Sequence, residues 1–166
     1  GDHGWHLGDH GQWCKHTNFE QATRAPLILR YPGMAHAGHK SEALTEFVDI
    51  YPTLCALAGL PLPDHLEGCS LVPLMEQPDR PWKKAAISQY PRSGVMGYSV
   101  RTPRYRYTKW VDKNDHSKVN AFELYDYERD PEERRNHAQD AENKGLIEEL
   151  DRLLEGGWKA ALPDAG

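Results

Sequence analysis

Short β-type segments fill much of the second half of this sequence, and they constrain the fold more than any other feature. Tyr, Val and Trp are frequent in them, which is typical of strands. Strands are predicted over residues 85–90, 97–101, 105–111 and 121–127. Apolar residues at helical spacing follow, with acidic residues opposite them, and predict a final helix over residues 146–154. We therefore expect a small antiparallel four-stranded sheet packed with a C-terminal helix.

The first half of the chain predicts short helices and one buried strand. A capping box at residues 17–20 predicts a short helix directly after it. The apolar run at residues 27–31 predicts a buried strand. Asp49 is expected to cap a helix over residues 50–58, which Gly59 ends. The apolar face of that helix is expected to contain Leu54, Cys55, Leu57 and Ala58, with Cys55 in the core.

A proline-rich stretch divides these two halves. Residues 61–81 hold five of the 12 prolines, and we place a domain boundary directly after them. Residues 1–81 and 82–166 are then the two parts of the chain. In the second part, Asp130 as N-cap, a proline next to it and Glu133 three residues on predict one further helix.

The charge pattern excludes several classes of protein. A net charge of −5 argues against nucleic-acid binding, and no apolar run is long enough to span a bilayer. Residues 92–118 nevertheless carry seven basic residues against two acidic ones. A local basic stretch in an acidic chain suits a small anionic ligand better than a long polyanion. Three scattered cysteines allow one disulfide pair and leave the redox compartment open.

The densest group of chemically active side chains lies at the start of the chain. It contains Asp2, His3, His6, Asp9, His10, Cys14, Lys15 and His16, with glycines between them. Oxygen and imidazole ligands beside glycine are typical of a metal loop. A polar loop held by its own side-chain hydrogen bonds explains the same residues, and the histidines leave a transition-metal binder open. Lys15 is either a solvated charge or a point-charge donor to an anionic oxygen.

Ordered motifs along nearly the whole chain resemble those of one enzyme family. They are Asp2-His3-Gly4, Leu7-Gly8-Asp9-His10-Gly11, Lys15, Pro26-Leu27-Ile28, Asp49 to Gly59, Ser88 to Arg92, Met96 to Ser99, Glu123 to Asp126, and Asp130-Pro131 with Glu133. The chain resembles the carboxyl-terminal part of the sulfatases of the alkaline phosphatase superfamily, with the iduronate-2-sulfatases as the nearest branch. This resemblance implies an α/β, alkaline-phosphatase-like sulfatase fold for residues 1–81, continued by a small α+β subdomain over residues 82–166.

The resemblance also implies roles for individual residues. Asp2 and His3 correspond to two ligands of a divalent metal, most often Ca²⁺ in this family. Lys15 corresponds to a catalytic lysine that contacts the sulfate ester, and Arg92 to an arginine that binds substrate. His10 is expected to order the metal loop through its neighbours. The basic residues 101–109 are expected to be a solvated strand face rather than a sugar-binding surface.

The sequence departs from the family in one respect. The family oxidises a cysteine or serine in a Cys-x-Pro-x-Arg type motif to formylglycine, and the contexts of Cys14, Cys55 and Cys69 do not fit it. We therefore expect the formylglycine nucleophile and the remaining metal ligands on an N-terminal portion of the same enzyme. Residues 1–166 alone are expected to be inactive.

The implied function is hydrolysis of a sulfate ester on a sulfated sugar or glycosaminoglycan, without a nucleic-acid or membrane partner. Two alternatives stay open beside it. One is a phosphonate monoester or phosphodiester hydrolase of the same superfamily, and the other is a non-catalytic module that binds anionic glycans. The resemblance suggests a periplasmic, secreted or lysosomal location, whereas the sugar and the position of the ester bond are left undefined.

Overall fold

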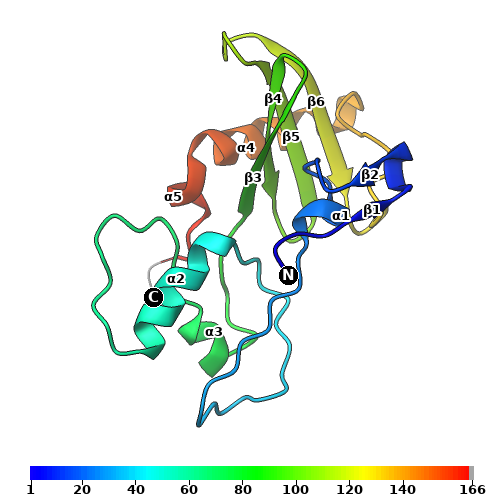
Figure 1. Ribbon diagram of the computed structural model, residues 1–166. Helices are drawn as coiled ribbons and strands as arrows, with labels where there is room; N and C mark the ends of the chain where they lie inside the picture. Colours follow the sequence, from blue (N-terminus) through cyan, green and yellow to red (C-terminus); the bar gives the residue numbers. More distant parts are fainter. Residues whose placement is uncertain (165–166) are drawn as a thin grey trace. The chain divides into compact units, whose positions relative to one another are not determined.

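The structure, a computed structural model, describes residues 1–164 and divides the chain into two compact units (Figure 1). The first unit contains Gly1–Leu27 and Ile87–Gly157, and the second contains Ile28–Ala86 and residues 158–164. The functional division at residue 82 stays a prediction. None of the helices within residues 1–164 combines the length and apolar character that a membrane span requires.

The first unit is built on the predicted antiparallel sheet. Its strands are β3 (Ala86–Arg92), β4 (Val95–Arg101), β5 (Tyr105–Asp112) and β6 (Val119–Asp126), paired in that order. The register places Tyr98 opposite Lys109 and Thr108 opposite Glu123. All four predicted strands are confirmed, with bounds that differ by a few residues from those predicted.

One face of the sheet packs against α4 (Lys144–Glu155), the predicted final helix. The Tyr107 hydroxyl donates to the Asp151 carboxylate at 2.9 Å, and the Lys109 ammonium lies 3.0 Å from the same carboxylate. Leu150 of α4 and Val100 of β4 are buried. Since both Tyr107 and Lys109 point to this side, their neighbours on β5 point to the other.

The N-terminal segment covers the opposite face of the sheet (Figure 1). It contains β1 (His6–Leu7), a 3-10 turn η1 (Asp9–Gly11), β2 (Trp13–Cys14) and α1 (Glu20–Thr23). The Asn18 amide donates to the carbonyl of Gly97 at 3.1 Å, and the Glu20 N–H donates to the Glu133 carboxylate at 2.8 Å. The short helix after residue 17 is confirmed, but the capping box is not. The Glu20 carboxylate accepts from Arg106 instead of capping its own helix.

Gly97 lets an indole ring pack directly on this face of the sheet. A Cβ at Gly97 would lie 2.7 Å from a ring carbon of Trp110 on the neighbouring strand. We expect Gly97→Ala to lower the free energy of unfolding by about 1–3 kcal/mol, because the indole must move. Urea denaturation measures this, with Gly145→Ala on α4 as control, where a Cβ meets nothing within 4 Å. Equal losses of stability in the two variants would contradict the packing argument.

The second unit contains η2 (Phe47–Asp49), α2 (Ile50–Leu57), α3 (Val72–Glu76) and the residues of α5 (Gly157–Ala161) from Trp158 onward. Helix α2 and the end at Gly59, which has φ +66°, are confirmed. Asp49 does not cap α2 with its side chain. Its buried carboxylate accepts from Lys83 at 2.7 Å and from the Cys69 N–H at 2.9 Å. Cys55 is buried as predicted, whereas Leu54 is 54% exposed.

Two predicted elements are wrong. Residues 24–31 form no strand, and Ile28 is 89% exposed. No described strand pairs with this run, and an apolar run without a neighbour has no partner for its backbone groups. The helix predicted after Asp130 is absent as well. Glu133 instead has φ +55° and a buried side chain, so the chain turns there, and a 3-10 turn η3 (Ala141–Asn143) leads into α4.

Candidate functional site

Asp2 and His3 form a close pair at the start of the first unit. The Nε2 atom of His3 lies 3.3 Å from the Asp2 carboxylate, and Nδ1 lies 2.7 Å from the carbonyl of Gly4. If Nδ1 carries the ring proton and donates to that carbonyl, Nε2 faces the carboxylate with its lone pair. An oxygen and a nitrogen acceptor at this distance suit a shared cation or proton.

Gly4 fixes this pair against the first unit. A Cβ on Gly4 would lie 2.0 Å from the carbonyl oxygen of Gln21, and the Gly4 N–H donates to Ala22 at 2.8 Å. Glycine is therefore required for the loop to approach α1 so closely. Within residues 1–164, no group of three or more His, Cys, Asp or Glu side chains is placed to hold a metal ion. The Asp2 carboxylate is the kind of oxygen ligand that Ca²⁺ takes, whereas the His3 imidazole is not, so a calcium ion here would need further oxygen ligands.

Lys15 follows the hairpin formed by β1 and β2. The hairpin is tightly turned, with positive φ at Gly8, His10, Gly11 and Cys14. His6 is fully buried at its base and pairs through Nε2 with the Thr17 hydroxyl at 2.7 Å. Burial lowers the pKa of His6, and nearby His10 adds to this effect. Among residues 1–164, no carboxylate lies within ion-pair distance of the half-buried Lys15, so its charge is available to an anionic ligand.

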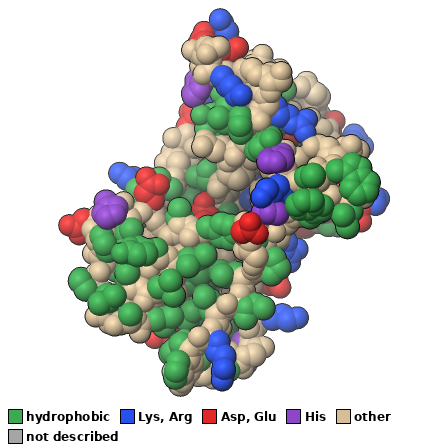
Figure 2. Space-filling view, in the orientation of Figure 1, with side chains coloured by type: hydrophobic (Ala, Val, Ile, Leu, Met, Phe, Trp, Pro, Cys, Tyr) green, Lys and Arg blue, Asp and Glu red, His purple; other side chains and the backbone are tan. Residues whose placement is uncertain are grey.

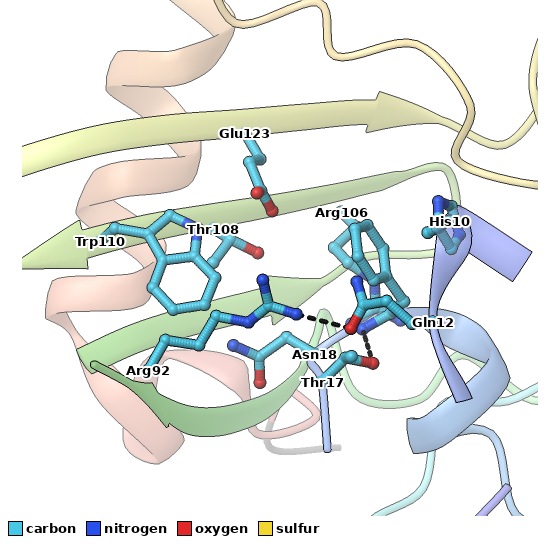
Figure 3. A pocket seen from close by; sticks show the side chains of 10 residues that line it. His10, Gln12, Thr17, Asn18, Arg92, Arg106, Thr108, Trp110 and Glu123 are labelled. Carbon is cyan, nitrogen blue, oxygen red and sulfur yellow. Dashed lines mark hydrogen bonds between the residues drawn. The ribbon is translucent and has the colours of Figure 1, made fainter. Parts of the chain in front are cut away.

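A polar pocket of about 180 Å³ lies between this N-terminal segment and the sheet (Figure 3). Gln12 and Asn18 contribute from the N-terminal side, and Arg92, Trp110 and Glu123 from β3, β5 and β6. The Arg92 guanidinium donates to the Gln12 side-chain carbonyl at 2.5 Å. The ring of His10 also lines the pocket, stacked on Phe19 at 4.0 Å between centroids.

Glu123 is the acidic group of this pocket. Burial raises the pKa of its carboxyl, and a hydrogen bond from Trp110 and the charge of Arg92 oppose that shift. Arg106 also lines the pocket, but its charge is already paired. It donates to Glu133 at 2.6 Å through Nε and to Glu20 at 2.6 Å through Nη2. The free polar capacity of the pocket therefore belongs mainly to Arg92, Glu123, the Gln12 amide nitrogen and His10 Nε2, which is buried without a hydrogen-bond partner among residues 1–164.

The basic run at residues 101–109 is neither solvated nor free. Each of its cations pairs with an acid: Arg101 with Glu20, Arg104 with Asp126, Arg106 with Glu133, and Lys109 with Asp151. Burial opposes the charge on Arg106, but Tyr127, Glu133 and Glu20 outweigh it and raise its pKa. The expectation of a solvated face is therefore wrong. The neutralised run also gives little support to a module that binds anionic glycans through it.

The candidate site residues from the sequence analysis do not form one cluster in the structure. Arg92 and His10 line the pocket, Asp2 and His3 form their own pair, and Lys15 follows β2 and is not part of the pocket lining. Their metal-binding and catalytic roles stay predictions. The sequence analysis missed Glu123 and Trp110 as pocket residues. Both lie on the same face of the sheet as Thr108, since Trp110 is two residues after it on β5 and Glu123 is opposite it on β6. The alternation of side chains along the strands would have predicted this once the register was known.

The four-stranded sheet with its C-terminal helices is the architecture seen in sulfatases of the alkaline-phosphatase-like fold. The sequence model of the family "N-sulphoglucosamine sulphohydrolase, C-terminal" matches residues 8–159, and the chain belongs to this sulfatase family. It is 35% identical to mouse (Mus musculus) iduronate 2-sulfatase, over 90% of this chain and 39% of that protein.

Solved structures agree with this assignment. A protein solved in complex with its substrate D-glucosamine-2-N,6-O-disulfate matches with a TM-score of 0.84 and 32% identity, over 96% of this chain and 33% of that one. The phosphonate monoester hydrolase of Agrobacterium radiobacter matches with a TM-score of 0.79 and 29% identity, over 95% of this chain and 34% of that one. The chain thus spans about a third of the length of these relatives.

Proposed function

We propose that this chain is part of a sulfatase that hydrolyses a sulfate ester on a sulfated sugar. The observation that carries the proposal is the paired Asp2 carboxylate and His3 imidazole in a loop fixed by Gly4, inside a chain of the sulfatase family. Relatives of this chain include an iduronate 2-sulfatase and a protein that binds a disulfated glucosamine as substrate. Both support a sulfated sugar as the substrate class.

The residues of this chain have distinct tasks in the proposed reaction. Asp2 and His3 would hold a divalent cation, which we take to be Ca²⁺. When bound, that cation would supply positive charge for the sulfate oxygens. Lys15 adds a fixed ammonium charge, which lowers the barrier if it contacts the oxygens whose charge grows in the transition state. Arg92 contacts the sugar portion, and His10, stacked on Phe19, keeps the hairpin turn in place.

We also propose that the catalytic nucleophile, formylglycine, and further metal ligands come from another portion of the same enzyme. The outer face of α2 agrees with such a partner, since Tyr51 is 55% exposed and Leu54 is 54% exposed. Hydrophobic side chains gather over α2 and α3 (Figure 2). An apolar face of this kind is typical of a surface that another segment covers.

The isolated chain of residues 1–166 is expected to show no turnover of an aryl sulfate, since the nucleophile and part of the metal site are missing from it. The intact enzyme should hydrolyse the same substrate and lose activity when a chelator removes its divalent cation. Release of the aryl alcohol measures both activities. Turnover by the isolated chain would show that it carries a nucleophile of its own.

A second candidate activity is hydrolysis of phosphonate monoesters or phosphodiesters, which the likeness to the Agrobacterium radiobacter enzyme favours. Side-by-side assays of the intact enzyme with aryl sulfate, phosphodiester and phosphonate monoester substrates decide between them. We expect kcat/KM to be highest for the sulfate ester. A higher value for either phosphorus ester would replace the sulfatase proposal by the second candidate.

A further inference from the structure

The pocket formed by Gln12, Asn18, Arg92, Thr108, Trp110 and Glu123 has no task in the proposed reaction beyond the sugar contact of Arg92. Its lining includes neither Asp2, His3 nor Lys15. Its volume of about 180 Å³ is smaller than the ~300–1,000 Å³ typical of sites for drug-sized ligands. The space therefore suits one small ring and excludes a longer oligosaccharide.

The charges of the pocket favour an uncharged ligand. Arg92 is its one unneutralised guanidinium among the described lining residues, and the Glu123 carboxyl acts on the same space. The other guanidinium, that of Arg106, is held by Glu133 and Glu20. An anion would gain from Arg92, but it would offer the Glu123 carboxyl no donor, and any negative charge on that carboxyl would repel it. A ligand with both donors and acceptors, such as a ring with several hydroxyls, satisfies both groups.

The hydrogen-bonding capacity of the walls matches such a ring. Asn18 is largely occupied, since one amide N–H donates to Gly97 and its carbonyl accepts from Ser88, which leaves the second N–H. Arg92 has further N–H groups beyond the one that it donates to Gln12, and the Gln12 amide nitrogen is also a donor. Glu123 supplies acceptors, and the Trp110 indole forms a flat apolar wall beside Arg92 (Figure 3). Donors, acceptors and an aromatic wall together are typical of carbohydrate recognition.

We propose that this pocket is a carbohydrate subsite that takes one uncharged sugar ring, held by Arg92 and Glu123 against Trp110. The inference rests on the proposed function in one respect, namely that the sugar ring is part of a larger glycan substrate. The pocket would then bind a sugar unit that carries no sulfate. The protein would thus recognise the glycan at a sugar other than the one that carries the sulfate ester.

Titration of the intact protein with the methyl glycosides of glucose, galactose and N-acetylglucosamine tests this proposal. The readout is the indole N–H resonance of Trp110 in ¹⁵N-labelled protein, assigned by its loss in Trp110→Phe. We expect at least one glycoside to shift it with a Kd in the millimolar range, which is usual for a single small ring. Glu123→Gln and Arg92→Lys should each weaken binding about tenfold. Glu128→Gln, whose side chain is 65% exposed and pairs with Arg104, should bind as the wild type does.

Inorganic sulfate serves as the competing probe. A pocket that responds to sulfate and to none of the glycosides is an anion site, and that result overturns the proposal, as does a Trp110 signal that no probe moves. The ester assays are independent of this measurement. If the glycoside binds but no sulfate ester is hydrolysed, the proposed function fails while the subsite stands, and the reverse result removes the subsite alone.

Discussion

Replacing Lys15 by alanine in the intact enzyme is expected to lower kcat/KM for a sulfate ester by about 10²–10³-fold, the usual effect of removing one group that stabilises transition-state charge. Lys15 is half-buried directly after the tightly turned hairpin, and within residues 1–164 no carboxylate lies within ion-pair distance of it. Its charge is therefore available to the sulfate oxygens. Because the effect concerns charge that develops during the reaction, kcat should fall more than KM rises.

Two variants sharpen this prediction. Lys15→Arg keeps the charge but changes its geometry, and we expect partial activity from it. Lys113→Ala removes an exposed lysine from the loop between β5 and β6 and should leave kcat/KM unchanged. Unfolding curves of all three variants should match that of the wild type. If Lys15→Ala kept near-native turnover, the lysine would have no part in sulfate contact.

Arg106→Leu is expected to lower the free energy of unfolding by about 3–5 kcal/mol, because it leaves the buried Glu133 carboxylate without its cation and Glu20 with Arg101 alone. Arg106 and Glu133 are almost fully buried, and Glu20 joins them from α1. Urea denaturation of the isolated chain measures the loss. Arg129→Leu is the matched control, since that side chain is 68% exposed and lies 3.6 Å from Asp126. It should change stability by less than about 1 kcal/mol.

The double variant Arg106→Leu with Glu133→Gln separates charge from packing. If the large loss arises from an uncompensated carboxylate, removing the charge of Glu133 should recover part of it, and the two changes will not add. Strict additivity would show that Arg106 acts mainly through its packing volume.

Local patterns were sufficient to predict the sheet and the final helix. Strand formers and turn residues define β3 to β6, and the apolar spacing that includes Leu150 defines α4. Each of these elements could be predicted because its own residues, without a distant partner, favour that secondary structure. The pair formed by Asp2 and His3 could also be found, since the two residues are adjacent in the chain.

The incorrect predictions have a common physical cause. Each of these segments depends on contacts with residues far away in the sequence, or on their absence. Glu133 has a positive φ and a buried ion pair with Arg106, 27 residues away, and this contact overrides the helix start that Asp130 predicts. The apolar run at residues 27–31 has the composition of a strand, but composition cannot supply a neighbouring strand. The pocket could not be predicted for the same reason. Gln12 and Glu123 line it together only because the N-terminal segment packs on the sheet in one particular register.

The contacts that hold the N-terminal segment on the sheet also determine when it can become ordered. Asn18 and Gly97 are 79 residues apart, and Glu20 and Glu133 are 113 residues apart. Contacts of such long sequence separation form slowly, because a large loop must close first. On a ribosome, the segment that carries Lys15 would emerge well before Glu133 and would have to wait for the whole sheet to be synthesised. The segment that carries Asp2, His3 and Lys15 is thus made before the rest of the first unit but becomes ordered only after the sheet is complete.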